Sequence, residues 1–442
     1  MRPIIRFSST PLSRGISTSA PVSAVAKPKK AGATSKNAKQ GFNQKKKEVS
    51  PGGSGGSGQS TVALKFSMAG QPPDLSDLPR LQPGNFKSDN VGKPTTFPKA
   101  TFDKLRAFSL SKKVEQELSS NGGPASVIRQ STIDLARQLD ANKGKSSKDS
   151  RYVLTGERGS GKSMLLLQTV AYAMESGWIV LFNPKATEWT NSSSHFIYDP
   201  LTQLFSQWQS AQKILSTLLA VNKDNLDAIK LTSDIELAQG KTATKGSKLS
   251  ELVANGSKDD RIAVKALDSV MAVLEKQTQF PVLWAIDETQ TLFTTSQYRT
   301  PEYQPIEPYH LSTPRLALDF ISGRRSFAKG TVLSALSLSD PKNPLSPSLI
   351  SGLKLATSQP ITPYTQLDPY HSLHASSGLK KREIPFNMSD KEVSGLYELL
   401  VRKGKTSANR SDNLYMELKS LSGGNPNEIK RGLSRLTAAI TV

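Results

Sequence analysis

The residues best suited to chemistry form a glycine-rich run, GERGSGKS, over residues 156–163. Its spacing is G-x-x-x-x-G-K-S, the pattern of a phosphate-binding loop. The glycines let the backbone turn several amide groups toward one anion, and a helix that follows adds the partial positive charge of its amino terminus. In this pattern Lys162 binds the β- and γ-phosphates and the Ser163 hydroxyl binds Mg²⁺. The predicted cofactor-binding residues are Gly156, Gly159, Ser160, Gly161, Lys162 and Ser163.

An acidic pair follows a later apolar run. An apolar strand that ends in an acid is typically the second half of a nucleotide site, the first half being the phosphate-binding loop. The run over residues 280–286 ends at Asp287 and Glu288. An aspartate here is suited to Mg²⁺ or to water bound to the ion, so the predicted metal site consists of Ser163 and Asp287. Glu288 is the candidate catalytic residue, because a carboxylate in this position can polarise an attacking water, as in additional-strand ATPases. An acidic turn after a strand is the alternative.

The hydrophobic pattern indicates which elements hold these residues. The spacing of Leu165, Leu166 and Val170 predicts an amphipathic helix over residues 164–176, and Gly177 is suited to end it in a left-handed turn. Apolar, β-branched runs predict strands at residues 151–156, 178–182, 280–286 and 331–336. Strands that alternate with helices favour an α/β fold with a parallel sheet flanked by helices.

Two further polar pairs are candidates for nucleotide chemistry. Ser337 or Ser339, just beyond the fourth strand, is a candidate sensor of the γ-phosphate, and an ordinary loop serine is the equal alternative. Arg324 and Arg325 are the candidate arginine finger of a ring-forming motor. A turn that faces RNA or solvent is the alternative for this pair.

The identity of the base does not follow from these spacings. Residues 221–225 read VNKDN, which approaches the N-K-x-D guanine reader of small GTPases. The fourth position is Asn225 instead of aspartate, and the segment precedes the strand that ends at Asp287. The D-x-x-G glycine is also missing, so the chain has no small-GTPase signature.

The predicted nucleotide-binding domain, residues 101–383, contains a long insertion at residues 200–280. Helical spacing predicts helices over residues 201–221 and 262–276, with a polar, Lys- and Gly-bearing stretch near 239–260 between them. A phosphate-loop enzyme does not need this insertion, so it is a candidate docking surface.

The carboxyl-terminal residues 384–442 predict a small helical lid. Ser389 and Glu392 have the spacing of a capping box, which marks the start of a helix. Asn425 is placed to cap a further helix, in which Pro426 takes the first position.

Composition bounds the function classes. The 442 residues include no cysteine, which excludes disulfides, cysteine-ligated zinc or iron–sulfur sites and a thiol nucleophile. Lys and Arg number 58 against 37 Asp and Glu, a net charge of +21, which suggests a polyanionic partner such as nucleic acid. No apolar stretch approaches the ~20 residues that a transmembrane helix needs, so no membrane partner is expected.

The amino terminus carries half of the excess charge, with eleven basic residues and one acid in residues 1–48. Residues 1–25 set three arginines among serines and small apolar residues without an acid, the composition of a mitochondrial transit peptide. A basic tail that binds nucleic acid is the alternative. Residues 26–100 predict a low-complexity, extended basic arm, with little regular structure expected as far as residue 110.

The motifs, taken in order, resemble the death-associated-protein-3 family in its fungal form. They are GERGSGKS, WIVLFNP, VLWAID, TVLSALS and LSGGNPNEIKR. The resemblance implies a P-loop NTPase fold of the AAA-like branch and a GTP-binding protein of the mitochondrial small ribosomal subunit, located in the matrix. It also implies that GTP or GDP, in preference to ATP, binds with Mg²⁺. Glu288 departs from the glycine that animal members carry after the aspartate.

The family further implies a structural protein rather than an enzyme, with slow GTP hydrolysis left open. Its expected partners are small-subunit rRNA, neighbouring proteins of the subunit head and the large subunit across the interface. A mitochondrial AAA-like ATPase, acting as a motor or chaperone, is the alternative that the nucleotide motifs leave open.

Overall fold

The computed structural model describes residues 75–119, 122–238, 240–356, 361–404 and 412–440. The predicted transit peptide, residues 1–25, lies outside the described residues, as does the predicted arm up to residue 74. Within the described part of the chain, no helix is long and apolar enough to cross a membrane.

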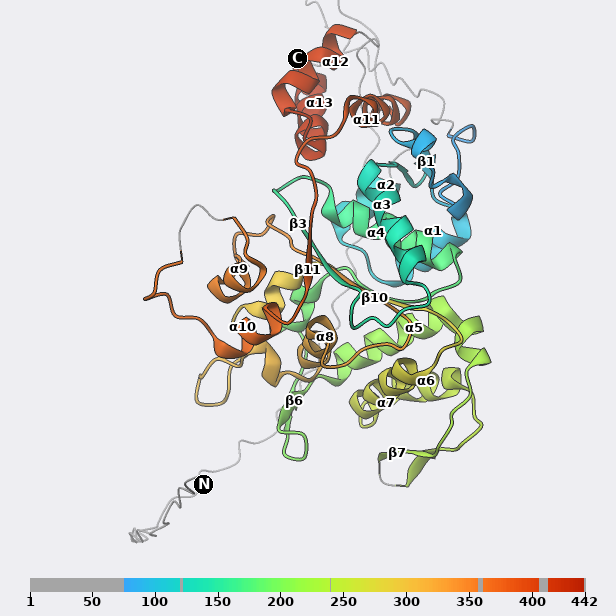
Figure 1. Cartoon of the computed structure of the whole chain (residues 1–442), viewed down its shortest axis with the longest axis vertical. Coiled ribbons are helices and arrows are strands. Elements are labelled where there is room, and N and C mark those ends of the chain that lie inside the picture. The colour runs from blue at the N-terminus through green and yellow to red at the C-terminus, as the bar shows by residue number, and fades with distance from the viewer. Residues whose placement is uncertain (1–74, 120–121, 239, 357–360, 405–411, 441–442) are drawn as a thin grey trace, which may run out of the picture. The chain divides into compact units, whose positions relative to one another are not determined.

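A five-stranded parallel sheet organises the described chain (Figure 1). Its order is β11-β3-β10-β9-β4, and every neighbouring pair is parallel. Strand β10 therefore separates β3, which leads into the glycine-rich run, from β9, which leads into Asp287. The strands are β3 Arg151–Thr155, β4 Ile179–Asn183, β9 Val282–Ile286, β10 Gly330–Ala335 and β11 Lys380–Glu383.

The four predicted strands all form, each within two residues of its expected bounds. The fifth strand, β11, was not predicted. Its sequence, KKRE, has no apolar residue, and Lys380, Lys381 and Glu383 are exposed at the edge of the sheet. Its pairing with β3 comes from the long-range path of the chain and not from a local pattern.

Helices cover both faces of the sheet, so the predicted α/β fold with a flanked parallel sheet is confirmed. Side chains alternate between the faces as the strand period requires. Leu154, Leu283 and Leu333 face one hydrophobic core, while Val153 and Trp284 face the other. The first core is completed by α1 Lys99–Ala107, α3 Gln130–Asn142 and α4 Lys162–Glu175, and the second by α5 Trp208–Ala228, α6 Leu249–Lys258, α7 Ala263–Lys276 and α8 Ser312–Ser322.

The insertion between β4 and β9 is largely helical, as predicted, but several of its elements differ, among them the unpredicted hairpin of β7 (Ile235–Ala238) and β8 (Lys241–Ala243). The helix expected from residue 201 begins at Trp208, because β5 (Ile197–Asp199) and β6 (Leu204–Ser206) pair as an antiparallel hairpin before it. The polar stretch near 239–260 contains a whole helix, α6. Its leucines and Val253 lie at helical spacing and are buried, which stabilises the helix despite its polar neighbours.

Asn222, in the segment that approaches a guanine reader, is a structural residue. Its side-chain oxygen accepts from the Val180 amide at 2.8 Å, and its amide nitrogen donates to the Val180 carbonyl at 2.9 Å. The side chain thus satisfies backbone groups of β4, the strand at the sheet edge. This contact explains the pattern without a nucleotide base.

The proline-rich stretch before α1 has more regular structure than its composition predicts. Strand β1 (Pro94–Thr96) pairs antiparallel with β2 (Ala125–Val127), and α1 follows. The expectation of little regular structure through residue 110 is therefore wrong for this part. The prolines stand where they are tolerated, since Pro94 begins a strand and Pro98 is the N-cap of a helix.

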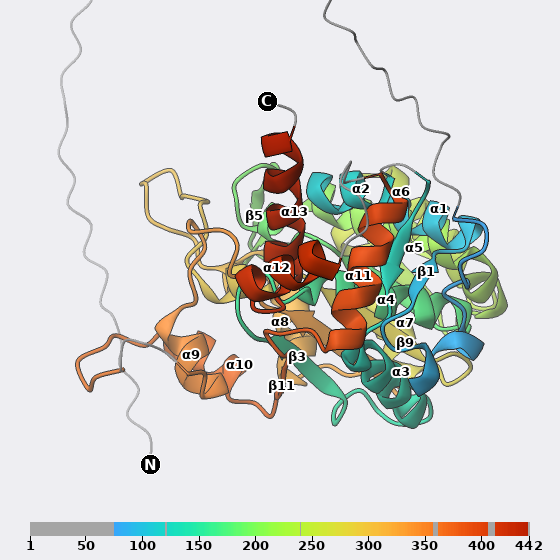
Figure 2. The same cartoon turned by 90° about the horizontal axis from the view of Figure 1, so that it is seen from above.

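Three helices form the carboxyl-terminal part of the described chain (Figure 2). The capping box of Ser389 and Glu392 is present at the start of the first of them, as predicted. This helix packs on β1 and β2, and Val393 and Leu396 share a buried cluster with Val127 of β2. The helices are α11 Asp390–Arg402, α12 Asp412–Ser422 and α13 Pro426–Ile440.

The close approach of α11 to the amino-terminal segment predicts a steric effect at Gly395. A Cβ atom there would lie 1.6 Å from the Gly92 carbonyl oxygen, so α11 or the segment before β1 must move if the residue is enlarged. We expect Gly395→Ala to lower the free energy of unfolding by about 1–3 kcal/mol, the usual cost of overpacking. Urea denaturation followed by tryptophan fluorescence measures it. Gly144→Ala, where no atom lies within 4 Å of the added carbon, is the control. Equal stability of the two variants would contradict the packing argument.

Candidate nucleotide-binding site

The glycine-rich run forms the turn between β3 and α4. Gly156, Gly159 and Gly161 have φ angles of 129°, 84° and 89°, which favour glycine. The loop is also closely packed: a Cβ atom at Gly156 would lie 2.6 Å from the Ile384 carbonyl oxygen, and one at Gly159 would lie 2.7 Å from Asn425 Oδ1. The end of β11 and the carboxyl-terminal helices therefore both contact the loop.

Lys162 lies inside this loop and is 6% exposed. Its Nζ donates to the carbonyl oxygens of Gly156 and Glu157, both at 2.8 Å, and lies 3.4 Å from Ser160 Oγ. Burial lowers the pKa of Lys162 to about 8, although the nearby Asp287 and Glu157 carboxylates favour its charged form. An anion bound in the loop would favour the ammonium form as well.

The predicted metal residues lie side by side. The Ser163 side chain interacts with the Asp287 carboxylate and favours its charged form, and Asp287 Oδ1 accepts from the Glu288 amide at 2.8 Å. Burial, with a smaller contribution from the Glu288 charge, raises the pKa of Asp287 to about 6. The interactions with Ser163, the Glu288 amide and Lys162 oppose this rise. A hydroxyl next to a carboxylate fits Mg²⁺, which is usually held by one or two protein oxygens together with substrate phosphates.

Glu288 is turned away from free solution. Its Oε2 accepts from Thr187 Oγ1 at 2.6 Å, on the 3₁₀ helix Ala186–Trp189. Burial raises the pKa of Glu288, partly offset by the Thr187 hydrogen bonds and by Lys185. Its φ of 58° lies in the left-handed region, where glycine is unstrained. The glycine expected here in animal members fits the same backbone, so the acidic side chain is an addition to the turn and not a requirement of it.

A buried arginine that sequence reasoning missed connects the loop to the rest of the chain. Arg129 Nη1 donates to the Ser160 carbonyl, and its Nε lies 3.5 Å from Glu392 Oε2. The two side chains of this ion pair are 8% and 5% exposed. Burial lowers the pKa of Arg129, and Glu392 opposes that shift. No local signal in the sequence marks a pair whose members lie 263 positions apart.

Asn425 has a second role beyond the predicted cap. Its Oδ1 accepts from the Asn427 and Glu428 amides at 2.9 and 3.3 Å, which confirms the cap. Its Nδ2 donates to the Arg158 carbonyl at 3.2 Å, so the start of α13 is bonded to the phosphate loop. The sequence pattern shows the cap but gives no indication of this contact.

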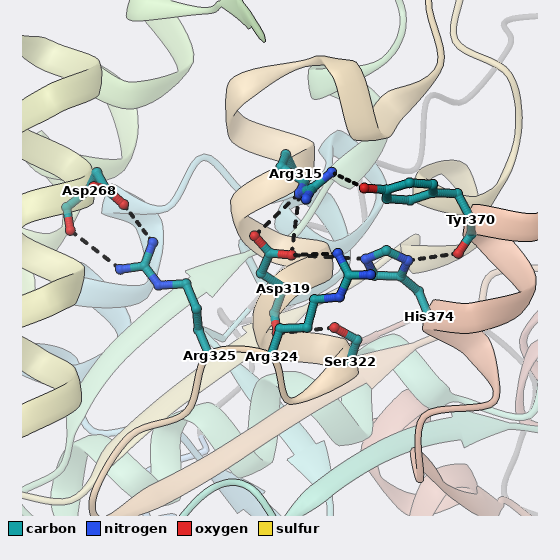
Figure 3. A network of polar contacts seen from close by, with 8 residues as sticks. All are labelled: Asp268, Arg315, Asp319, Ser322, Arg324, Arg325, Tyr370 and His374. Carbon is teal, nitrogen blue, oxygen red and sulfur yellow. Dashed lines mark hydrogen bonds and ion pairs between the residues drawn. The ribbon is translucent and has the colours of Figure 1, made fainter. Parts of the chain in front are cut away.

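The remaining candidates lie in different surroundings. The Ser337 amide donates to the buried Gln290 side chain at 2.9 Å, and its sensor role stays a prediction. Arg325 forms an ion pair with Asp268 of α7 (Figure 3) and a second one with Glu275 of the same helix. Its side chain is 22% exposed, and both interpretations of the Arg324 and Arg325 pair stay predictions. Figure 3 also shows Arg324 beside Asp319, Tyr370 and His374.

The parallel sheet, the glycine-rich loop after β3 and Asp287 after β9, with β10 between these two strands, define an α/β protein with a P-loop NTPase-like fold. The family model for the mitochondrial ribosomal death-associated protein 3 matches residues 126–432, and the chain belongs to this family. The resemblance seen in the motifs and the expected mitochondrial localisation are thereby confirmed.

Curated relatives agree with this membership. The small ribosomal subunit protein mS29 of Schizosaccharomyces pombe is 28% identical over 363 residues, 80% of this chain and 73% of the relative. The protein of the same name from Neurospora crassa is 27% identical over 357 residues, 78% and 75% of the two chains. The Bos taurus protein is 26% identical over 190 residues, 42% and 48%. The longer fungal matches fit a fungal-type member.

The Arg129–Glu392 pair generates a stability prediction. Arg129→Met leaves Glu392 buried without its cation, and breaking a buried pair in this way costs about 3–5 kcal/mol. The double variant Arg129→Met/Glu392→Met leaves no buried charge, so we expect it to recover part of that loss. Arg137→Met, on an exposed position of α3, is the control and should change stability by less than about 0.5 kcal/mol. Urea unfolding tests this, and a double variant less stable than Arg129→Met would contradict it.

The pKa of Asp287 generates a pH prediction. Because folding raises this pKa from 3.8 to about 6, the native state keeps the Asp287 proton to a higher pH than the unfolded state does. The protonated carboxyl therefore stabilises the fold at low pH, and this stabilisation is lost as pH rises from about 4 to 6. Without nucleotide and in EDTA, Asp287→Asn should therefore be more stable than wild type at pH 7.5, by about 2–3 kcal/mol. The difference should vanish near pH 4.

Melting temperatures across this pH range measure the effect. Asp224→Asn, at an exposed position of α5, should keep the wild-type profile. A lower stability of Asp287→Asn at pH 7.5 would show that the buried carboxylate has a stabilising partner.

Proposed function

We propose that this chain is a structural component of the mitochondrial small ribosomal subunit, located in the matrix, that holds GDP or GTP with Mg²⁺ and contributes to mitochondrial translation. Family membership and the name of the relatives, small ribosomal subunit protein mS29, support the ribosomal role. The observation that carries the nucleotide role is the buried Lys162 ammonium within the glycine-rich loop, next to the Ser163–Asp287 pair.

The contacts of the loop favour a stabilising nucleotide. Through Ser160 and Arg158 the loop is bonded to Arg129 before α3 and to Asn425 at the start of α13. A ligand that orders this loop therefore stabilises contacts between distant parts of the chain. A ligand at ~1,000 times its dissociation constant adds about 4 kcal/mol to the free energy of unfolding.

Turnover is less favoured by the same geometry. Hydrolysis needs a group that orients water and a cation that meets the developing charge. The Glu288 carboxylate accepts from Thr187, and the Arg129 guanidinium is used by the Ser160 carbonyl and Glu392. The presence of Glu288 still supports one second candidate, a mitochondrial AAA-like ATPase that acts as a motor or chaperone.

The expected partners follow from the ribosomal role. They are small-subunit rRNA, neighbouring proteins of the subunit head and the large subunit across the interface. The insertion, with the protruding hairpins β5–β6 and β7–β8 (Ile235–Ala238 and Lys241–Ala243), is our candidate for protein contacts. Exposed Ile197, Tyr198 and Leu201 in the first hairpin region support this role.

Two variants separate binding from turnover. Lys162→Ala should lose copurifying nucleotide and the rise in melting temperature that GDP or GTP gives, because the phosphates lose their cation. It should also sediment poorly with the small subunit. Glu288→Gln should keep nucleotide, assembly and mitochondrial translation, because binding depends on the loop. Lys213→Ala, an exposed lysine of α5, is the control.

Three results would contradict parts of the proposed function. Retained nucleotide and an unchanged melting temperature in Lys162→Ala would overturn the nucleotide role. Normal assembly of Glu288→Gln with translation abolished would favour the ATPase alternative. Stronger stabilisation by ADP or ATP than by GDP or GTP would overturn the choice of base.

A further inference from the structure

The end of the sheet at which its parallel strands begin lies opposite the phosphate loop. It carries a group of exposed lysines, which we call the basic edge. They come from the segment between α3 and β3, from the first half of β11 and from the end of α9 (Pro347–Leu353). The basic edge comprises Lys143, Lys145, Lys148, Lys354, Lys380 and Lys381. Since parallel strands all begin at one edge, these residues lie away from the nucleotide site, which is at the strands' carboxyl ends.

These lysines form no ion pair with a carboxylate in the described residues, although the exposed Asp149 and Glu383 offset part of their charge. In the described residues the lysines that form ion pairs are Lys185, Lys213, Lys241, Lys419 and Lys430, none of which belongs to the basic edge. Lys380 and Lys381 instead donate to the backbone carbonyls of Asp149 and Lys354. The neighbouring arginines differ, because Arg325 and Arg324 are paired with carboxylates (Figure 3).

A buried arginine holds the segments of the basic edge together. Arg151 Nε donates to the Lys148 carbonyl at 2.8 Å, Nη1 to the Ile321 carbonyl at 3.0 Å and Nη2 to the Ser377 carbonyl at 2.9 Å. Arg151 is 7% exposed, and its guanidinium donates to these three carbonyl groups. Its positive charge, offset in part by the Asp149 carboxylate, lies beneath the lysines. At Gly323 an added Cβ would lie 2.6 Å from Arg151 Cζ, which shows how closely the loops enclose this side chain.

The extent of the basic edge matches a polyanion. Lys380 and Lys381 lie on β11, and the Lys145 carbonyl accepts from Gly330 at the start of β10, so the face spans three adjacent strands. Strands about 4.8 Å apart make this about 10 Å. A nucleic acid duplex carries one charge per ~1.7 Å of its axis when both strands are counted, so a segment of this length holds about six phosphates, of which only part face one surface.

We propose that the basic edge binds the phosphate backbone of RNA. Lysine ammonium groups act as point charges on phosphates without reading sequence. A docking protein or a lipid surface would need apolar anchors, and no exposed large apolar side chain comes from residues 143–151 or 379–383. The proposal rests on the proposed ribosomal function, because it identifies the surface that contacts rRNA. It leaves the nucleotide site free to be occupied at the same time.

The test compares two charge-matched variants of the full chain. The edge variant carries Lys145→Gln, Lys148→Gln, Lys380→Gln and Lys381→Gln. The control carries Lys223→Gln, Lys230→Gln, Lys245→Gln and Lys248→Gln, four exposed lysines of the insertion. Both keep the basic amino-terminal residues, so any RNA binding by those residues is common to all proteins compared.

Filter binding to a transcript of mitochondrial small-subunit rRNA, from about 50 to 200 mM salt, gives the readout. Each phosphate contact contributes about 0.7–0.9 to the slope of log K against log salt, so the edge variant should lose about 3 units of slope. We expect its affinity near 150 mM salt to fall at least about tenfold, while the control changes less than about twofold.

Each other outcome overturns the proposal. Equal losses in both variants would mean that net charge alone matters, and no loss in the edge variant would mean that another surface binds RNA. Selective loss of binding to phosphatidylserine vesicles, with RNA binding retained, would assign the face to a membrane. The rise in melting temperature with GDP should be the same in the edge variant as in wild type. This separates the present proposal from the nucleotide proposal, since either can fail alone.

Discussion

The buried ion pair between Arg129 and Glu392 is the interaction on which the arrangement of the site depends. It joins the segment before α3 to the first helix of the carboxyl-terminal group, and the same guanidinium holds the Ser160 carbonyl of the phosphate loop. Two charges removed from water are costly unless they are paired. Moving α11 away from α3 would leave both buried charges without a partner, so the pair favours the observed arrangement of these two helices.

In the absence of ligand, the charges of Lys162 and Asp287 at the loop are disfavoured by burial. Binding of an anion and a cation would stabilise them. Burial depresses the pKa of Lys162 and raises that of Asp287, so each group is held where its charged form is disfavoured. Phosphates beside the ammonium and Mg²⁺ beside the carboxylate would reverse both effects. The fold thus places its least stable charges where the proposed ligand supplies the missing partners, and this links nucleotide binding to stability without any need for turnover.

The sequence predicted those strands and loops that are determined by interactions between residues close together in the chain. Apolar runs gave β3, β4, β9 and β10, and the glycine spacing gave the loop, because both depend on residues a few positions apart. It did not predict β11, whose residues are polar, or the hairpin β5–β6, whose pairing replaced the start of an expected helix. The Arg129–Glu392 pair and the contact from Asn425 to the loop depend on residues brought together only by the whole fold.

The two ends of the strands would let one scaffold separate the two kinds of anion binding that we propose. At the carboxyl ends of the strands the Lys162 ammonium is buried within its own loop, which suits one small ligand. At the amino ends the lysines are exposed and unpaired with acids, while a buried arginine fixes the backbone that bears them. A buried site gives affinity for a compact phosphate group, and an exposed one suits a long polymer whose charges are spaced along a surface. Because β3 begins at Arg151 and leads into Gly156, this one buried strand supports the backbone of both proposed sites.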